Sequence, residues 1–422
     1  MSTTFQAATD VGRRREHNED AYLADPGLQL YVVADGMGGH ASGEVASGLA
    51  AQAFRDFADE RRDLVMGFRD GSPEIEPWMV RRLLEDSLHG ACREVYRKAQ
   101  EAPEMRGMGT TLVALLVAGE RAFVCHVGDS RAYLVRGGKT VLLTRDHSVL
   151  NELVMRGDIS EEAAAKDLMG LRHALSRAVG VCEDVEVDTM DFEVLPGDLF
   201  LLASDGLTQY LRPDELTPFA EAPLDEIPGA LVALANDRGG SDNITAICVR
   251  VDVDSLDPAG DVIRSRDFET KISTFQSLPL FQHLQYGELI RVLSATDVAT
   301  VPAGEVILRE GEEGDAMYVV LCGRIVLEKA GEKIAEFGRG AHFGEVSLID
   351  KAPRSATATV TEEARLLRLR REHLYSLVKR DPEIAVKLLW SFAETLGDRL
   401  RTTTDAFADL RALMGGGVVE GV

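Results

Sequence analysis

Strand-like apolar runs recur through the first 250 residues and constrain the fold more than any other feature of this chain. The clearest are LQLYVVAD, GTTLVALLVAG, RAFVCHVGD, DLFLLASD and NITAICVRVDV, and several are joined by glycine turns such as Gly137-Gly138. Turns of this kind connect antiparallel strands into hairpins. Two long helical patterns, at about residues 44–60 and 77–100, interrupt the strands. Strands paired mostly by turns, with a few long helices, predict a layered α+β domain.

The strand pattern breaks after Val253. Residues 254–271 are polar, charged and poor in aromatic side chains, which predicts an exposed linker. A short helical segment, glycine-punctuated strands and a helical C-terminal region follow. We therefore expect one domain at residues 1–253, a second at residues 272–414 and a flexible tail at residues 415–422.

Net charge and cysteine usage exclude several classes of protein. The formal net charge of −24 argues against nucleic acid as a partner, because neutralising phosphates requires clustered Lys and Arg. The five cysteines are odd in number and lack C-x-x-C spacing, and neither a secretory leader nor an apolar run long enough for a membrane span is visible. The sequence therefore predicts a reduced, cytoplasmic protein with no membrane association.

Carboxylates recur in the first domain at the ends of apolar strands and near the N-terminus. They are Glu19, Asp20, Asp35, Asp129, Asp205 and Asp242. One such residue is usually a turn or cap, but several that converge repel one another unless cations neutralise them. An oxygen-only ligand set favours Mg²⁺ or Mn²⁺. Two such ions can share a water and lower its pKa toward neutrality, which suits in-line attack on phosphorus.

Seven motifs then carry a resemblance to a known family. They are TDVGRRREHNEDAYL, VVADGMGGHASGEVAS, MGTT, HVGDSRAYL, LTRDHS, LLASDGL and GGSDNIT. In this order they resemble the bacterial type 2C metal-dependent protein phosphatases, over residues 5 to about 252. The resemblance implies an αββα sandwich, hydrolysis of phosphoserine and phosphothreonine, and a flap at residues 148–181. The phosphoprotein partner would be a serine/threonine kinase or one of its targets.

The resemblance also implies a ligand set for two metal ions. Asp35 would bridge the two ions, and the carbonyl of Gly36 would add a ligand. Asp205 and Asp242 would hold one ion, and Glu19 would help to hold the other through water.

Four further residues acquire roles from the same resemblance. Asp129, with Asp205, matches the third, weaker metal site of bacterial members. Asp20 would orient metal-bound water, and Arg15 falls where the family places an arginine that grips phosphate oxygens. His40 has two open roles, as a general acid for the leaving oxygen or as a structural loop residue.

Residues 343–357, FGEVSLIDKAPRSAT, form a second functional motif. Gly344 and Glu345 open a short helix whose free N–H groups favour a phosphate, and Arg354 can form a charge-assisted bond to that phosphate. Glu345, if buried beside a ribose, would accept a hydrogen bond from the 2′-hydroxyl. The motif resembles the phosphate-binding cassette of cyclic-nucleotide-binding domains, over about residues 275–401, and this implies a β-roll (jelly roll) with flanking helices.

The choice of nucleotide stays open at this point. Ser355 has a hydroxyl that could touch the N2 amine of guanine, but serine also occurs at this place in cAMP-binding members. The sequence favours cAMP over cGMP only slightly.

Three functions are compatible with these motifs. The favoured one is an active phosphatase regulated by the cyclic nucleotide. The second is an active phosphatase with a vestigial sensor used for docking, against which Glu345 and Arg354 argue. The third is a non-catalytic, nucleotide-sensing adaptor, against which the complete carboxylate set argues.

Apolar residues from Leu389 to Met414 follow alternating four–three spacing, which is typical of a heptad seam. The seam predicts either a homodimer through the C-terminal helix or a helix that packs on its own β-roll.

Overall fold

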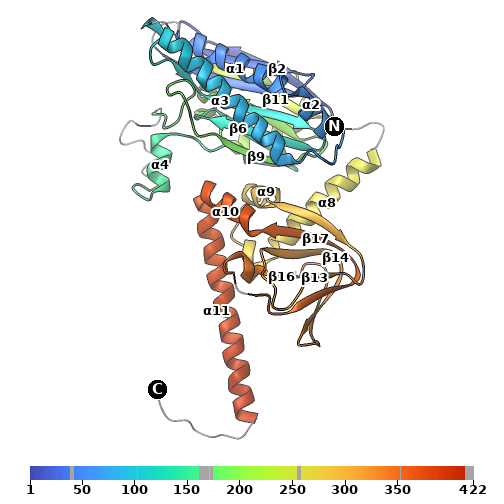
Figure 1. The fold of residues 1–422 in the computed structure, drawn as a ribbon. Helices are drawn as coiled ribbons and strands as arrows, with labels where there is room; N and C mark the ends of the chain where they lie inside the picture. Colours follow the sequence, from blue (N-terminus) through green and yellow to red (C-terminus); the bar gives the residue numbers. More distant parts are fainter. Residues whose placement is uncertain are drawn as a thin grey trace. The chain divides into compact units, whose positions relative to one another are not determined.

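The structure is a computed structural model that divides into two compact units, Met1–Ser265 and Arg266–Val422 (Figure 1). Residues 39–41, 102, 161–170, 172–173, 254–257, 352 and 414–422 lie outside the described part of the chain. This exclusion covers His40, Met414, the predicted tail at residues 415–422 and much of the predicted flap. In the described part, every helix lacks the length or the hydropathy that a bilayer span requires.

Two antiparallel sheets form the centre of the N-terminal unit. The first has the order β1 (Thr3–Asp10), β11 (Ile244–Val251), β10 (Leu199–Ala203), β7 (Arg131–Arg136), β8 (Lys139–Leu142). The second has the order β2 (Asp20–Asp25), β3 (Leu30–Met37), β5 (Leu112–Ala118), β6 (Arg121–Val127), β9 (Asp188–Glu193), with β4 (Gly109–Thr110) paired to β3. The predicted α+β class is therefore confirmed.

Helices cover the outer faces of both sheets. Helices α1 (Ser42–Asp59), α2 (Arg62–Arg69) and α3 (Pro77–Glu101) share a core with alternate residues of β3, β5 and β6. Helix α7 (Ile227–Asp237) and the short α6 (Asp205–Thr208) share another core with β10 and β11. The remaining strand residues are buried on the opposite faces, because side chains alternate along a strand.

Aromatic pairs connect the two sheets across their inner faces. Phe5 of β1 lies 5.4 Å from Tyr31 of β3, and Phe192 of β9 lies 6.1 Å from Phe200 of β10, measured between ring centroids. Burial on both faces explains why these strands read as continuous apolar runs in the sequence.

The C-terminal unit is built on a six-stranded antiparallel sheet with a small apolar core. Its strands are β12 (Thr296–Val301), β13 (Val306–Leu308), β14 (Ala316–Lys329), β15 (Glu332–Phe337), β16 (His342–Phe343) and β17 (Thr357–Arg370). Its helices include α9 (Tyr286–Ser294), the 3₁₀ turn η5 (Glu345–Leu348), α10 (Arg371–Arg380) and α11 (Pro382–Leu413).

Helix α8 (Pro258–Gln276) occupies most of the segment that the sequence predicts to be a linker. Phe268, Ile272 and Phe275 recur at spacings of four and three along this helix and are buried. Phe275 also stacks on Phe281 at 4.5 Å. A few apolar residues at helical spacing thus order a segment whose overall composition is polar.

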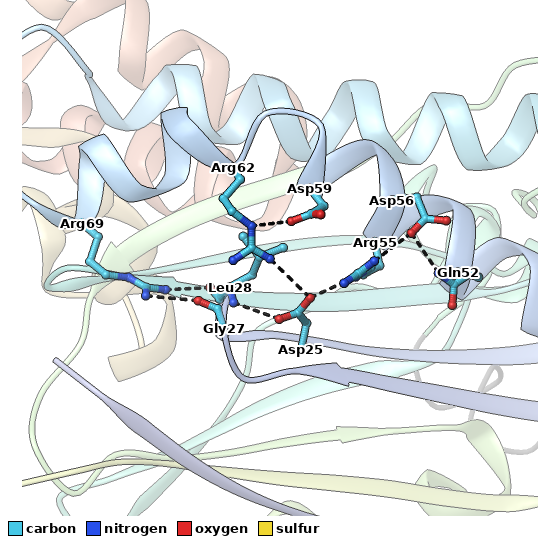
Figure 2. Close-up of polar contacts among 9 residues, drawn as sticks. All are labelled: Asp25, Gly27, Leu28, Gln52, Arg55, Asp56, Asp59, Arg62 and Arg69. Carbon is cyan, nitrogen blue, oxygen red and sulfur yellow. Dashed lines mark hydrogen bonds and ion pairs between the residues drawn. The ribbon is translucent and has the colours of Figure 1, made fainter.

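Asp25, at the end of β2, connects the β2–β3 turn to α1 (Figure 2). One carboxylate oxygen accepts from the Leu28 N–H at 3.0 Å and the other from Arg55 Nε at 2.9 Å. Burial acts to raise the pKa of Asp25, but these two hydrogen bonds, together with the charges of Arg55 and Arg62, outweigh it and hold the pKa below its ordinary value. The neighbouring Asp56 is exposed and accepts from Arg55 and Gln52.

We expect Asp25→Ala to lower the free energy of unfolding by roughly 1.5–3 kcal/mol, the usual contribution of hydrogen bonds to a charged group. The matched variant Asp56→Ala removes only exposed contacts and should cost less than about 1 kcal/mol. Urea unfolding followed by circular dichroism measures both. Because the pKa of Asp25 is lowered in the folded state, the effect should persist at neutral pH and shrink as the pH falls below about 4. Equal losses in the two variants would contradict this account.

Candidate functional site

The predicted carboxylates come from strand ends and loops at one end of the N-terminal sandwich. Asp20 and Asp35 are direct partners in the β2–β3 ladder. Asp129 lies in the turn between β6 and β7, Asp205 opens α6 directly after β10, and Asp242 lies in the loop before β11. The pKa of Asp35 responds to the charges of all four of the others. The structure therefore brings these five residues together.

Glu19 and Gly36 join the same end through close backbone contact. The Gly36 N–H donates to the Glu19 carbonyl at 3.1 Å. A Cβ at Gly36 would lie 2.1 Å from the Gly43 carbonyl oxygen, and one at Gly206 would lie 1.9 Å from that of Asn243. Glycine is required at both places because the loops that carry the carboxylates pack so closely.

Burial and mutual repulsion make the charged state of this cluster costly. Burial, and then the neighbouring charges of Asp20 and Asp205, raise the pKa of Asp35 well above its ordinary value. Burial likewise raises the pKa of Asp20 to about 7, and that of Asp129 to about 7. The protein thus keeps acidic groups in a place where their ionised forms are disfavoured.

The chemistry of these donors fits divalent cations. Asp20 Oδ2 accepts from Ser204 Oγ at 2.7 Å, whereas its buried Oδ1 has no hydrogen-bond partner within the described residues. Carboxylate and carbonyl oxygens are the ligands that Mg²⁺ and Mn²⁺ prefer. Cations would relieve the repulsion and satisfy a buried oxygen at the same time.

Arg15 lies at the edge of this cluster. Its Nη2 donates to Asp242 Oδ2 at 2.8 Å, and its side chain is half exposed. An exposed guanidinium beside partly buried carboxylates leaves donors available to an incoming anion.

The sequence reasoning missed Asn243, which fixes the segment that carries Arg15 and Glu19. Its Oδ1 accepts from the Glu19 N–H at 2.8 Å, and its Nδ2 donates to the carbonyls of Val11 at 3.0 Å and His17 at 2.9 Å. The signal was its place next to Asp242 in the GGSDNIT motif. A pattern cannot show that one amide reaches three backbone groups more than 220 residues away.

A second group, His126, His147 and Asp188, could also hold a metal ion by residue type. The two imidazole rings stack at 4.6 Å with an interplanar angle of 18°, so their in-plane lone pairs do not converge on one point. Arg177 Nη1 lies 3.0 Å from Asp188 Oδ1 and balances its charge. We therefore interpret this group as a structural tether at the base of the predicted flap.

Backbone hydrogen bonds attach the C-terminal end of the predicted flap to His147 and to β4. The Ser176 N–H donates to the His147 carbonyl at 2.9 Å, and Val179 exchanges both backbone hydrogen bonds with Thr110. Within the flap, the structure describes helix α4 (Val149–Met155). His40, whose role as a general acid or as a structural loop residue the sequence leaves open, lies outside the described residues.

In the C-terminal unit, the predicted nucleotide residues gather around one buried guanidinium. Arg354 is 7% exposed and donates to Ser347 Oγ at 2.8 Å, the Gly344 carbonyl at 3.2 Å and the Ala316 carbonyl at 2.7 Å. Its buried Nε has no hydrogen-bond partner among the described residues. Glu345 is buried as well. Burial lowers the pKa of Arg354, so this unit holds a desolvated cation that an anion would stabilise.

Glycines leave the space that this guanidinium fills. A Cβ at Gly314 would lie 2.2 Å from Arg354 Nε, and one at Gly344 would lie 2.5 Å from Nη1. Gly344 also has a φ of 79°, which favours glycine. Ser355, by contrast, is exposed. The sequence reasoning missed Ser347, whose hydroxyl orients the guanidinium.

Comparison with known families accounts for both units. The family described as protein phosphatase 2C matches residues 12–227, and the one described as cyclic nucleotide-binding domain matches residues 298–381. The chain is similar to the serine/threonine phosphatase stp of Listeria monocytogenes, with 36% identity over 250 residues, or 58% of this chain and 94% of the relative. Protein phosphatase PhpP of Streptococcus pneumoniae is 33% identical over 250 residues, or 57% of this chain and 94% of the relative.

Solved structures give the same result for the N-terminal unit. The serine/threonine phosphatase PstP/Ppp of Mycobacterium tuberculosis matches with 31% identity and a TM-score of 0.51, covering 60% of this chain and 100% of that chain. The serine/threonine phosphatase of S. agalactiae matches with 33% identity and a TM-score of 0.52, covering 59% and 100%. The resemblance carried by the seven motifs and by the phosphate cassette is confirmed at the level of both families.

We expect Asp35→Asn to raise the melting temperature of the metal-free protein at pH 8, because it removes a partly buried charge that repels its neighbours. Each kcal/mol regained should add roughly 2–4 °C. Carboxylates with raised pKa values destabilise the fold as the pH rises, so the gain should shrink toward pH 5. The same variant should lose the stabilisation that added Mn²⁺ gives to the wild type.

Asp198→Asn is the matched control for this prediction. Asp198 is more deeply buried than Asp35, and burial raises its pKa too. Its charge faces the buried Arg136 and not other carboxylates, so Asp198→Asn removes the carboxylate that pairs with a buried arginine and should lower the melting temperature. Scanning calorimetry with and without EDTA measures both variants. A lower melting temperature for metal-free Asp35→Asn would contradict the repulsion argument.

Proposed function

The chain belongs to the protein phosphatase 2C family of metal-dependent serine/threonine phosphatases and carries a cyclic nucleotide-binding domain, and from this premise we propose that cAMP or cGMP regulates its phosphatase activity. The observation that carries the proposal is Arg354, a buried guanidinium whose Nε has no partner in the described residues. A buried cation without an ion-pair partner lowers the stability of the domain. A domain that no longer bound an anion would therefore gain stability by losing this arginine.

The catalytic part of the proposal assigns metal ligands to the carboxylate cluster. Asp35 would be shared between two Mn²⁺ or Mg²⁺ ions, and the Gly36 carbonyl would add a ligand. Asp205 and Asp242 would hold one ion, and Glu19 would help to hold the other through water. Such ions lower the pKa of water and stabilise charge on the phosphoryl oxygens. A third ion would lie between Asp129 and Asp205.

Two side chains of the chain itself would complete the reaction. Arg15, half exposed beside Asp242, would bind the phosphoryl oxygens of a phosphoserine or phosphothreonine and hold the phosphorus in line. Asp20, whose Oδ1 has no hydrogen-bond partner within the described residues, would accept a hydrogen bond from the attacking water. The substrates would be phosphoproteins, namely a serine/threonine kinase or its targets. A general-acid role for His40 stays a prediction.

The nucleotide site is proposed to bind the cyclic phosphate through Arg354 and the backbone of η5. Glu345 would accept from the ribose 2′-hydroxyl, and burial would strengthen that bond. Ser355 lies exposed directly after Arg354 and would be able to meet the base, so cAMP and cGMP both fit. The nucleotide that changes the phosphatase rate at the lower concentration would be the regulatory ligand.

We also propose that the protein forms a homodimer through α11. The exposed apolar residues of this helix include Leu389, Leu396, Leu400 and Phe407, which recur at spacings of seven, four and seven. This is the spacing of a two-stranded seam. A helix that packed this stripe on its own sheet would bury these side chains, so their exposure supports a second copy as the partner.

We expect the full-length protein to hydrolyse a phosphothreonine peptide with Mn²⁺, and a cyclic nucleotide to change the rate by about 5- to 150-fold, the usual range of allosteric couplings. Arg354→Ala should abolish the response to both nucleotides. Arg324→Ala, an exposed arginine of the same unit, should keep it. A hydrolysis rate that neither nucleotide changes at millimolar concentration would support a vestigial sensor. A protein that hydrolyses no phosphopeptide at all would support a non-catalytic adaptor.

We expect Leu400→Glu to convert the dimer into a monomer, because it places like charges across the seam. Ala408→Glu adds the same charge to the exposed surface of α11, next to the seam position Phe407, and should leave the dimer intact. Sedimentation velocity of the full-length protein distinguishes the two outcomes. A wild type that sediments as a monomer would refute the dimer without affecting the nucleotide proposal.

A further inference from the structure

Thr111 makes an unusual pair of contacts with the backbone of Asp35. Its N–H donates to the Asp35 carbonyl at 2.9 Å, and its Oγ1 accepts from the Asp35 N–H at 2.9 Å. Thr111 directly precedes β5, which pairs with β3 from Leu30↔Leu116 to Val33↔Val113. A side-chain hydroxyl thus replaces the main-chain acceptor at the end of this ladder, at the residue proposed to bridge two metal ions.

The opposite side of Thr111 contacts the turn that carries Asp129. Its Oγ1 lies 2.7 Å from the hydroxyl of Ser130. A Cβ at Gly128 would lie 2.6 Å from Thr111 Cγ2, so the threonine methyl packs directly on the Gly128 backbone. Thr111 therefore touches both residues that flank Asp129. Thr111 is 3% exposed and Ser130 is 1% exposed, so water does not compete for these hydrogen bonds.

We propose that Thr111 is a positioning residue that fixes Asp129 relative to Asp35 and thereby sets the affinity of the metal centre. The proposal rests on the function proposed above for these two carboxylates. Asp35 and Asp129 repel each other. The His147 N–H also holds this turn, through the Gly128 carbonyl at 2.9 Å, and Thr111 joins the turn directly to Asp35. Groups behind the direct ligands hold a metal site in its productive geometry.

The hydrogen-bond capacity of one hydroxyl explains why the residue must be an alcohol. A threonine hydroxyl has one proton and two lone pairs. One lone pair accepts from the Asp35 N–H, and the proton or the other lone pair engages Ser130. Valine has the same shape but would leave the buried Asp35 N–H without a partner, whereas serine would keep the hydroxyl.

The test is Mn²⁺ binding to the full-length protein, measured by electron paramagnetic resonance of the free ion and by calorimetry. Thr111→Val should weaken Mn²⁺ binding by about 10- to 100-fold, the usual effect of losing a group behind the ligands. Thr111→Ser should stay within a few-fold of the wild type. Ser130→Ala, which removes one contact and leaves the Asp35 N–H bonded, should fall between them.

Activity as a function of Mn²⁺ separates positioning from a general structural role. If Thr111 positions the ligands, Thr111→Val should need more Mn²⁺ for half-maximal rate but recover its kcat at saturation. A general folding defect would instead lower the rate at every Mn²⁺ concentration with an unchanged midpoint, and this would overturn the proposal.

The remaining outcomes are also distinct. A Thr111→Val protein that binds Mn²⁺ as tightly as the wild type overturns the role of Thr111 and leaves the proposed metal centre in place. A wild type that binds no Mn²⁺ overturns the metal centre itself. Should Thr111→Val fail to fold, Ser130→Ala decides, and unchanged Mn²⁺ affinity in that variant counts against the tether.

Discussion

Repulsion among partly buried carboxylates is the constraint on which the architecture of the N-terminal unit depends. Burial raises the pKa values of Asp20 and Asp129 to about 7, so holding them ionised together costs stability. The sandwich offsets this cost with two helix–sheet cores and aromatic contacts between the sheets. Glycines such as Gly36 let the loops approach closely enough for the carboxylates to meet. The fold thus supplies the free energy that keeps a cation site assembled before any cation arrives.

The C-terminal unit follows the same physical logic with the opposite charge. Arg354 is buried against carbonyls and a hydroxyl, all of which are neutral acceptors, and its desolvation lowers its pKa. A bound phosphate would place a negative charge beside this guanidinium. Each unit is therefore less stable without its ligand than it would be with it, and ligand binding and stability are linked in both.

The features that repeat along the chain can be predicted from the sequence. The role of a residue cannot be predicted when it depends on a single contact with a distant part of the chain. Continuous apolar runs predicted the strands, and acidic residues at their ends predicted the cluster. The roles of Asn243 and Thr111 depend on which backbone groups lie opposite them, and sequence spacing does not encode this. Helix α8 shows the reverse case, because three buried apolar residues order a segment whose average composition is that of a linker.

The charges around Asp129 explain why a neutral tether suits this site. Arg131 lies two residues away, but its Nε and Nη2 donate to both oxygens of Asp146 at 2.8 and 2.7 Å. Its charge is thus largely taken up by another carboxylate, and Asp129 keeps a raised pKa. An arginine or lysine in place of Thr111 would neutralise Asp129 and compete with the cation, whereas a hydroxyl fixes the turn without adding charge. The chain therefore places its guanidinium groups at the edge of the cluster and hydroxyl groups at its centre, and this leaves the carboxylate charge for metal ions.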